Sequence, residues 1–367
     1  MDKPTAFLAD RIFTGEQWLE DHAVVIDKNR IIDVCPSSVL PSGISVTRFD
    51  NNLIVPAFID LQIYGAYEKL LAVYPETDSL YKLIGYCQKG GAAYCLPTVA
   101  TNKPEVFYKS INAIRNYWEK NGNGILGLHI EGPWISKEKR GAHIESLIHS
   151  PGTKEVEELL NYGKDVIKMI TLAPEVCNRE IIELILSYNI IISAGHSNSN
   201  YKEATQGFER GITAVTHLYN AMSGLHHREP GLVGATFDHS SVMASIIPDG
   251  HHVNYAALRI AKKIMGERLF AITDAVTGTN KGYYQHQLTG DKYEAAGILS
   301  GSALTMNKAL QNLVKHGCIE LTEALRMCSL YPAKVLKMEN ELGKIEKGYK
   351  VSMTILNKTL EVIKLIV

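Results

Sequence analysis

Short apolar runs rich in β-branched residues alternate with amphipathic helical patterns along residues 56–342 of this chain. The clearest helical patterns span residues 105–119, 180–187, 201–210 and 255–265. Strands that alternate with helices pair in parallel, because each helix carries the chain back to where the next strand begins. Eight such units close into an α/β barrel of the (β/α)8, TIM-like kind, which is the fold we predict. A doubly wound open sheet is the alternative, although no glycine-rich dinucleotide fingerprint follows a first strand.

The two ends of the chain carry a different pattern. Short strand-like runs at residues 6–8, 23–26, 30–35 and 44–46 are separated by Gly, Pro, Asn and Asp, and similar runs return at residues 351–356 and 360–367. Because domain ends often lie close together, strands from both termini can pair with one another. We therefore predict one small β-sandwich from residues 1–55 and 343–367, beside a barrel of residues 56–342.

Composition narrows the classes of partner. The 367 residues are 46% apolar and 21% charged, with a formal net charge of −1. This balance argues against a nucleic-acid or membrane-surface protein, since both need a basic excess. The sequence contains no run of about 18 apolar residues, which is the length that a membrane-spanning helix needs. The six cysteines are scattered with no Cys-x-x-Cys pair, which favours free thiols in a reducing compartment, so we expect a cytoplasmic protein.

Four apolar runs each end on a residue suited to metal or proton chemistry. These residues are Glu131, His196, His217 and Asp274. In a parallel barrel the carboxyl ends of all strands meet at one opening, so these side chains should converge. Two imidazoles and one carboxylate form a common ligand set for a catalytic divalent ion, and a further carboxylate can carry protons. A single strand-end His is more often structural and a single Asp often caps a helix, but four together favour one site.

Eight motifs lie between residues 129 and 306: HIEGP at 129–133, GAH at 141–143, SAGHS at 193–197, THLYNAM at 216–222, REPG at 228–231, DGHHV at 249–253, TDA at 273–275 and SGSALTM at 300–306. In this order they resemble the branch of the amidohydrolase superfamily that deacetylates N-acetylglucosamine 6-phosphate. THLYNAM and EGP are the most specific of them.

The resemblance implies roles at the reacting end of a substrate. Glu131, His196 and His217 would hold the metal ion. Asp274 would take a proton from water and later protonate the departing nitrogen, and His143 would orient and polarise the acetyl carbonyl.

The resemblance also implies roles at the phosphate end. Asn220 and Ala221 would offer backbone N–H groups to the phosphate. His252 and Arg228 would contact the sugar-phosphate end, with Arg228 contributed across the interface of a homodimer or higher homo-oligomer. Arg presents a planar, permanently charged fork that suits phosphate. By contrast, we expect the neighbouring His226, His227 and His251 to be loop histidines, while His129 suits either the site or the barrel core.

One departure from the superfamily pattern concerns the number of metal ions. Many amidohydrolases carry His-x-His at the end of the first barrel strand, where a second metal binds. Gln62 and Tyr64 stand at these two positions, and neither is a good zinc ligand. We therefore expect one divalent ion per subunit, Zn²⁺ first, with Fe²⁺, Co²⁺ or Mn²⁺ as alternatives.

The activity that the resemblance implies is hydrolysis of N-acetyl-D-glucosamine 6-phosphate to D-glucosamine 6-phosphate and acetate. The expected partner is thus a small amino sugar phosphate, with no nucleic acid and no membrane. Two alternatives stay open. One keeps the machinery and acts on another N-acyl amino sugar phosphate or a cyclic amide, and the other is a barrel scaffold without turnover.

Overall fold

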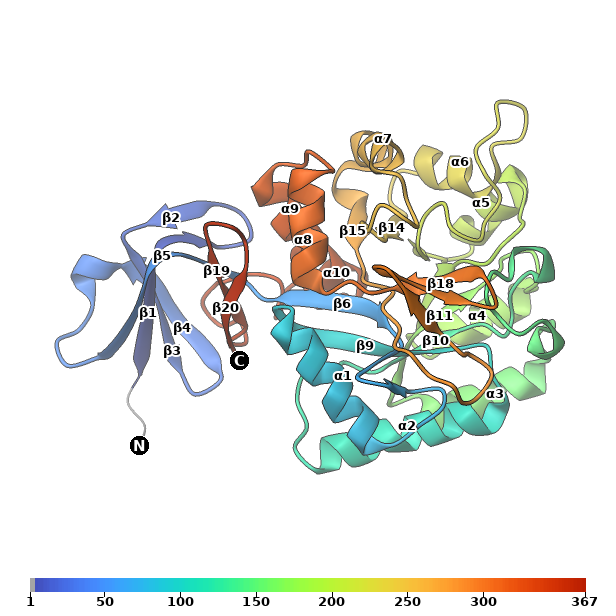
Figure 1. The fold of residues 1–367 in the computed structure, drawn as a ribbon, viewed down its shortest axis with the longest axis horizontal. Coiled ribbons are helices and arrows are strands. Elements are labelled where there is room, and N and C mark those ends of the chain that lie inside the picture. The colour runs from blue at the N-terminus through green and yellow to red at the C-terminus, as the bar shows by residue number, and fades with distance from the viewer. Residues whose placement is uncertain (1–3) are drawn as a thin grey trace.

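A computed structural model describes residues 4–367, and it places eight parallel strands in one sheet (Figure 1). A parallel bridge between Ile63 and Ala275 links the two ends of this sheet, so that it nearly closes. The strands neighbour one another in chain order, whereas a doubly wound sheet reverses its order part-way. The predicted barrel is thereby confirmed. The eight strands are β6 (Phe58–Ile63), β9 (Ala92–Ala100), β10 (Leu128–Glu131), β11 (Ile167–Leu172), β12 (Ile191–Ala194), β13 (Ala214–Val215), β14 (Met243–Ile246) and β15 (Leu269–Ala271).

The helices pack around this sheet. Four of them, α2, α4, α5 and α7, match the predicted helical patterns to within one residue at each end. Asn178, Asn200 and Asn254 precede α4, α5 and α7, and each accepts a hydrogen bond from a backbone N–H of the first turn. Such caps satisfy donors that have no partner inside the helix. The helices are α1 (Thr77–Lys89), α2 (Pro104–Glu119), α3 (Thr153–Gly163), α4 (Arg179–Ser187), α5 (Tyr201–Glu209), α6 (Gly231–Asp238), α7 (Tyr255–Met265), α8 (Met306–Lys315), α9 (Leu321–Cys328) and α10 (Leu330–Val335).

A buried polar chain crosses the barrel interior. His129 faces the Leu61 carbonyl oxygen at 3.0 Å and the Thr171 hydroxyl at 2.8 Å. The hydroxyls of Thr171 and Thr216 are 2.7 Å apart, and Ser193 lies 2.6 Å from Thr216. Both ring nitrogens of His129 are thus engaged within the core, and His129 does not line the cavity at the strand ends. This histidine belongs to the barrel core.

The strands of the two termini form a separate seven-stranded sheet. β5 lies between β1, with which it is parallel, and β19, with which it is antiparallel. The C-terminal hairpin therefore completes a sheet that the N-terminal residues begin, as Figure 1 shows. Only Ala57 separates β5 from β6, so the division at residues 55/56 and 342/343 stays a prediction. The strands are β1 (Thr5–Phe13), β2 (Trp18–Glu20), β3 (His22–Asp27), β4 (Arg30–Pro36), β5 (Ser45–Pro56), β19 (Met353–Asn357) and β20 (Val362–Ile366).

Two small sheets were not predicted. One is the hairpin of β7 (Gly65–Ala66) and β8 (Lys69–Leu70), which follows β6. The other joins β16 (Gln287–Thr289), β17 (Lys292–Ala295) and β18 (Ile298–Ser302), and it follows β15. Since both follow barrel strands, both lie at the carboxyl ends of the strands, where an active site forms.

Two further expectations concern thiols and membrane spans. All six cysteines are free. Within residues 4–367, no helix combines the length and apolar character that crossing a membrane requires.

Candidate active site

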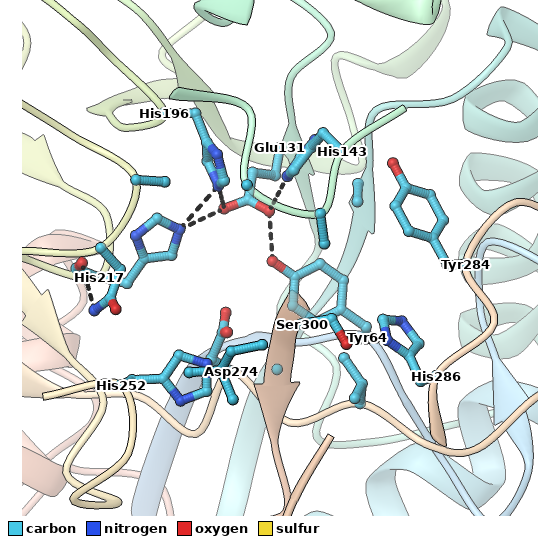
Figure 2. Close-up of a pocket in the computed structure, with 18 of the residues that line it drawn as sticks. Tyr64, Glu131, His143, His196, His217, His252, Asp274, Tyr284, His286 and Ser300 are labelled. Atoms are coloured by element: carbon cyan, nitrogen blue, oxygen red, sulfur yellow. Dashed lines mark hydrogen bonds and ion pairs between the residues drawn. The ribbon is translucent and has the colours of Figure 1, made fainter. Parts of the chain in front are cut away.

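A cavity of about 310 Å³ lies at the carboxyl ends of the barrel strands. Figure 2 shows polar side chains pointing into it from several strands. Eight of the predicted site residues line it: Glu131, His143, His196, His217, Asn220, Ala221, His252 and Asp274.

Three atoms in this cavity have the spacing of a metal ligand set. Glu131 Oε1 lies 3.2 Å from His217 Nε2 and 3.4 Å from His196 Nε2, and the two Nε2 atoms are 3.1 Å apart. Tetrahedral ligands at about 2.0–2.1 Å from a zinc ion lie about 3.3–3.4 Å from one another. The residues present therefore fit a single divalent ion held by one carboxylate oxygen and two imidazoles.

The second oxygen of Glu131 faces other groups. His143 Nε2 lies 3.1 Å from Glu131 Oε2, and the Tyr64 hydroxyl donates to the same oxygen at 2.5 Å. Ligand atoms of Glu131, His143 and His196 also lie within 4.8 Å of one another. We favour the set that contains His217, because its nitrogen and that of His196 approach the same carboxylate oxygen, whereas His143 approaches the other.

The backbone turns sharply where three of the site residues follow their strands. His196, His217 and Asp274 have φ angles of 47°, 34° and 53°, a left-handed conformation that costs non-glycine residues free energy and is concentrated at functional sites. The ring of His196 is fixed by its Nδ1, which donates to the Lys139 carbonyl oxygen at 3.0 Å. That bond leaves the Nε2 lone pair for a metal ion.

The buried charges of the site shift one another's pKa values. Burial alone would raise the pKa of Glu131, but the charge of His196 and hydrogen bonds from three histidines hold it well below its usual range. Burial raises the pKa of Asp274, and the nearby Glu131 carboxylate adds to that effect. Burial lowers the pKa of His143 to about 4, helped by the charge of His196. At neutral pH, His143 is thus an uncharged imidazole.

Gln62 and Tyr64 have a larger part in the site than their sequence positions suggested. The Gln62 side-chain nitrogen lies 2.8 Å from Asp274 Oδ1, 2.9 Å from Glu131 Oε1 and 2.7 Å from the Tyr64 hydroxyl. The pair therefore connects the Glu131 carboxylate to Asp274. Their place at the end of the first barrel strand was the signal in the sequence, and by itself it predicted only the number of metal ions.

Two other residues of the cavity were missed. The Tyr284 hydroxyl donates to the Thr101 carbonyl oxygen at 2.6 Å, and His286 Nδ1 lies 2.8 Å from the Ser300 hydroxyl. Tyr284 and His286 line the cavity but precede the unpredicted β16–β18 sheet. No strand or helix periodicity in the sequence marks this segment.

The predicted phosphate-binding residues do not all lie in the cavity. His252 is oriented by Asp249, whose Oδ2 lies 2.6 Å from His252 Nδ1. The Asn220 N–H already donates to the His217 carbonyl oxygen at 2.9 Å, so a phosphate would have to share it. Arg228 is exposed and does not line the cavity of its own chain; its Nε lies 3.1 Å from His227 Nε2.

Similarity to known proteins agrees with this geometry. Residues 53–367 match the amidohydrolase family, and residues 6–50 match the NagA composite domain. The chain belongs to the amidohydrolase family. This family is metal-dependent, and the Glu and His cluster described above is a potential site for the ion.

Relatives of this amidohydrolase include N-acetylglucosamine-6-phosphate deacetylase of Haemophilus influenzae, with 34% identity over 97% of this chain and 96% of the relative. N-acetylgalactosamine-6-phosphate deacetylase of Escherichia coli O157:H7 is 30% identical, over 96% of this chain and 95% of the relative. The crystal structure of N-acetylglucosamine-6-phosphate deacetylase from Pasteurella multocida has a TM-score of 0.95 and 32% identity, and covers 99% of this chain and 97% of its own. The amidohydrolase is thus similar to sugar-phosphate deacetylases over nearly its full length.

The ligand geometry predicts one tightly bound divalent ion per chain. Replacing His217→Ala should remove most of that ion, because two ligands hold a divalent ion much less tightly than three. Tyr64→Phe is the matched control, since it alters a neighbour of Glu131 that is not itself a ligand, and it should keep one ion. Elemental analysis of the three purified proteins checks this. Two ions in the unmodified protein would contradict the assignment.

Proposed function

We propose that this amidohydrolase hydrolyses the N-acetyl group of N-acetyl-D-glucosamine 6-phosphate, giving D-glucosamine 6-phosphate and acetate. The observation that carries the proposal is the convergence of Glu131, His196 and His217 with Asp274 in one cavity. A metal ligand set beside a carboxylate that can transfer protons is what metal-assisted amide hydrolysis requires. The names of the relatives support the choice of an amino sugar phosphate as the substrate.

A divalent ion held by Glu131, His196 and His217 would polarise the acetyl carbonyl and acidify a water molecule when bound. Asp274 takes a proton from the attacking water and returns it to the sugar nitrogen as the C–N bond breaks. Its position supports this task, since Gln62 holds Asp274 Oδ1 at 2.8 Å. Burial raises its pKa, which makes the carboxyl group a better temporary proton carrier at neutral pH.

The other predicted roles are distributed around this centre. His143, uncharged at neutral pH, has a single N–H, which it shares between Glu131 Oε2 and the acetyl oxygen. His252 and the Asn220–Ala221 turn receive the sugar-phosphate end, because they line the cavity beside His217. Arg228, exposed on its own chain, reaches the phosphate from a neighbouring subunit of a homodimer or higher oligomer.

Three finer proposals accompany the reaction. The ion is Zn²⁺, with Fe²⁺, Co²⁺ or Mn²⁺ as alternatives, because two imidazoles and a carboxylate suit zinc well. The protein is cytoplasmic, which its six free cysteines support. A second candidate substrate is N-acetyl-D-galactosamine 6-phosphate, which the Escherichia coli relative favours.

The proposal predicts a defined substrate preference. The metal-loaded enzyme should release acetate from N-acetylglucosamine 6-phosphate, and less efficiently from its mannose epimer and from the unphosphorylated sugar. Acetate release and metal content are measured on the same sample, with the galactosamine compound as a further arm. If the metal-loaded protein releases acetate from none of these compounds, the deacetylase proposal is wrong. The remaining hypotheses would then be hydrolysis of a cyclic amide and a barrel scaffold without turnover.

The role of Asp274 can be separated from metal binding. Asp274→Asn has nearly the same shape but cannot accept the proton of water, so kcat should fall by roughly 10²- to 10⁴-fold. Metal content and substrate affinity should stay close to those of the unmodified enzyme. His217→Ala is the comparison, because there metal and activity should fall together. Near-normal turnover of Asp274→Asn with its ion bound would assign the proton transfers to another group.

The role of Arg228 is tested by comparing two substrates. Arg228→Ala should raise KM for the phosphorylated sugar by roughly 30- to 150-fold, the value of one charge-assisted hydrogen bond. Hydrolysis of the unphosphorylated sugar should stay almost unchanged, since it offers nothing for the guanidinium to bind. Equal losses on both substrates would mean that Arg228 is structural.

A further inference from the structure

The cavity has two chemically different halves. In Figure 2, His217, His252 and Asp274 lie on one side of Glu131, and Tyr284 and His286 lie on the other. The first half holds the groups that we assign to the sugar-phosphate end and to proton transfer. Tyr284 and His286 have no part in the mechanism described so far.

This second half is an apolar wall. Five of its residues form a buried apolar cluster: Tyr64, Leu70, Ala100, Val276 and Tyr284. All five line the cavity, and Ala72 and Leu299 line it as well. The hydroxyl and phosphate groups of a sugar phosphate would find few hydrogen-bond partners on such a wall.

The topology explains why the wall forms on this side. Its residues come from the end of β9 and from the segments that follow β6 and β15. β6 pairs with β9 and is bridged to the segment after β15 through Ile63 and Ala275, so these three segments are neighbours. The turns that carry Asn220, Ala221 and His252 follow β13 and β14, farther around the barrel. Glu131, at the end of β10, lies between the two halves, as Figure 2 shows.

The hydroxyl groups of this half are already engaged. The Tyr64 hydroxyl donates to Glu131 and the Tyr284 hydroxyl to the Thr101 carbonyl oxygen. His286 Nδ1 pairs with Ser300, and burial lowers the pKa of His286 to about 4, so the ring carries no charge at neutral pH. The wall thus presents ring faces and aliphatic groups.

An amide substrate has a fixed direction in this cavity. Its carbonyl carbon bears the sugar nitrogen on one side and the acyl chain on the other. With the sugar phosphate toward Asn220, Ala221 and His252, the acyl chain extends across the metal centre toward Tyr64 and Tyr284. We propose that the apolar half is an acyl pocket that admits unbranched N-acyl chains of three and four carbons as well as acetyl.

This inference rests on the proposed function and widens its substrate class to N-acyl glucosamine 6-phosphates. The reaction is unchanged: the C–N bond breaks, the water oxygen joins the acyl carbon, and the amine leaves with a proton. The products are propanoate or butanoate and glucosamine 6-phosphate. Because the amine product is common to all chain lengths, one assay serves the whole series.

A tight pocket and a roomy pocket predict very different effects of one added methylene on kcat/KM. A pocket that fits only a methyl group disfavours an added methylene by about tenfold or more. An apolar pocket with room to spare instead gains about fourfold in kcat/KM for each methylene that it buries.

The experiment measures release of glucosamine 6-phosphate from the N-acetyl, N-propanoyl and N-butanoyl compounds by the metal-loaded enzyme. We expect kcat/KM for both longer chains to equal or exceed the acetyl value. A value more than threefold below it for N-propanoyl overturns the acyl pocket and leaves the deacetylase proposal intact. Failure to hydrolyse any of the three overturns both.

Variants locate the effect in the wall. Ala72→Leu and Ala100→Val each add bulk to the pocket, and either should lower kcat/KM for N-butanoyl at least tenfold while N-acetyl stays within threefold. Using two positions guards against one variant that does not fold. Ala256→Leu, on the exposed side of α7, is the control and should change neither substrate. The proposal is wrong if every wall variant that folds lowers kcat/KM for N-butanoyl and N-acetyl by the same factor. The acyl chain would then not lie against this wall.

Discussion

The site depends on the buried carboxylate of Glu131. A buried anion is stable only when donors or cations surround it, because the interior solvates charge poorly. One of its oxygens faces His196 and His217, and the other faces His143 and Tyr64. These partners come from different barrel strands and loops, so the carboxylate is stabilised only once the barrel has assembled. Folding and the formation of the metal site are therefore coupled.

Closure of the barrel also positions Asp274. The Asp274 N–H donates to the Gln62 carbonyl oxygen at 3.0 Å, and the Tyr64 N–H donates to the Ala275 carbonyl oxygen at 2.9 Å. These backbone bonds join the first barrel strand to the segment after the last. They place the Gln62 side chain where its single amide group reaches both Asp274 and Glu131. A shift in this register would separate Asp274 from Glu131.

The same closure divides the cavity by chemistry. The segments after β6 and β15 bring aromatic and aliphatic side chains to one side, and the turns after β13 and β14 bring polar groups to the other. An amide that lies across Glu131 then meets a different surface at each end. In amidohydrolases with His-x-His on the first strand, that strand provides metal ligands, whereas here Tyr64 provides both a hydrogen bond to Glu131 and a part of the apolar wall.

The sequence by itself determined the barrel, the sheet shared by the two termini, and the meeting of Glu131, His196, His217 and Asp274. It could do so because strand and helix periodicities are local, and because parallel strands always bring their carboxyl ends to one opening. Only the tertiary structure decided how Gln62 links Glu131 to Asp274, that His129 belongs to the core, and that Arg228 lies outside the cavity of its own chain. The apolar wall was decided in the same way, since Tyr284 lies in a segment without periodicity. Such contacts join residues far apart in the chain, and their geometry exists only after the barrel has closed.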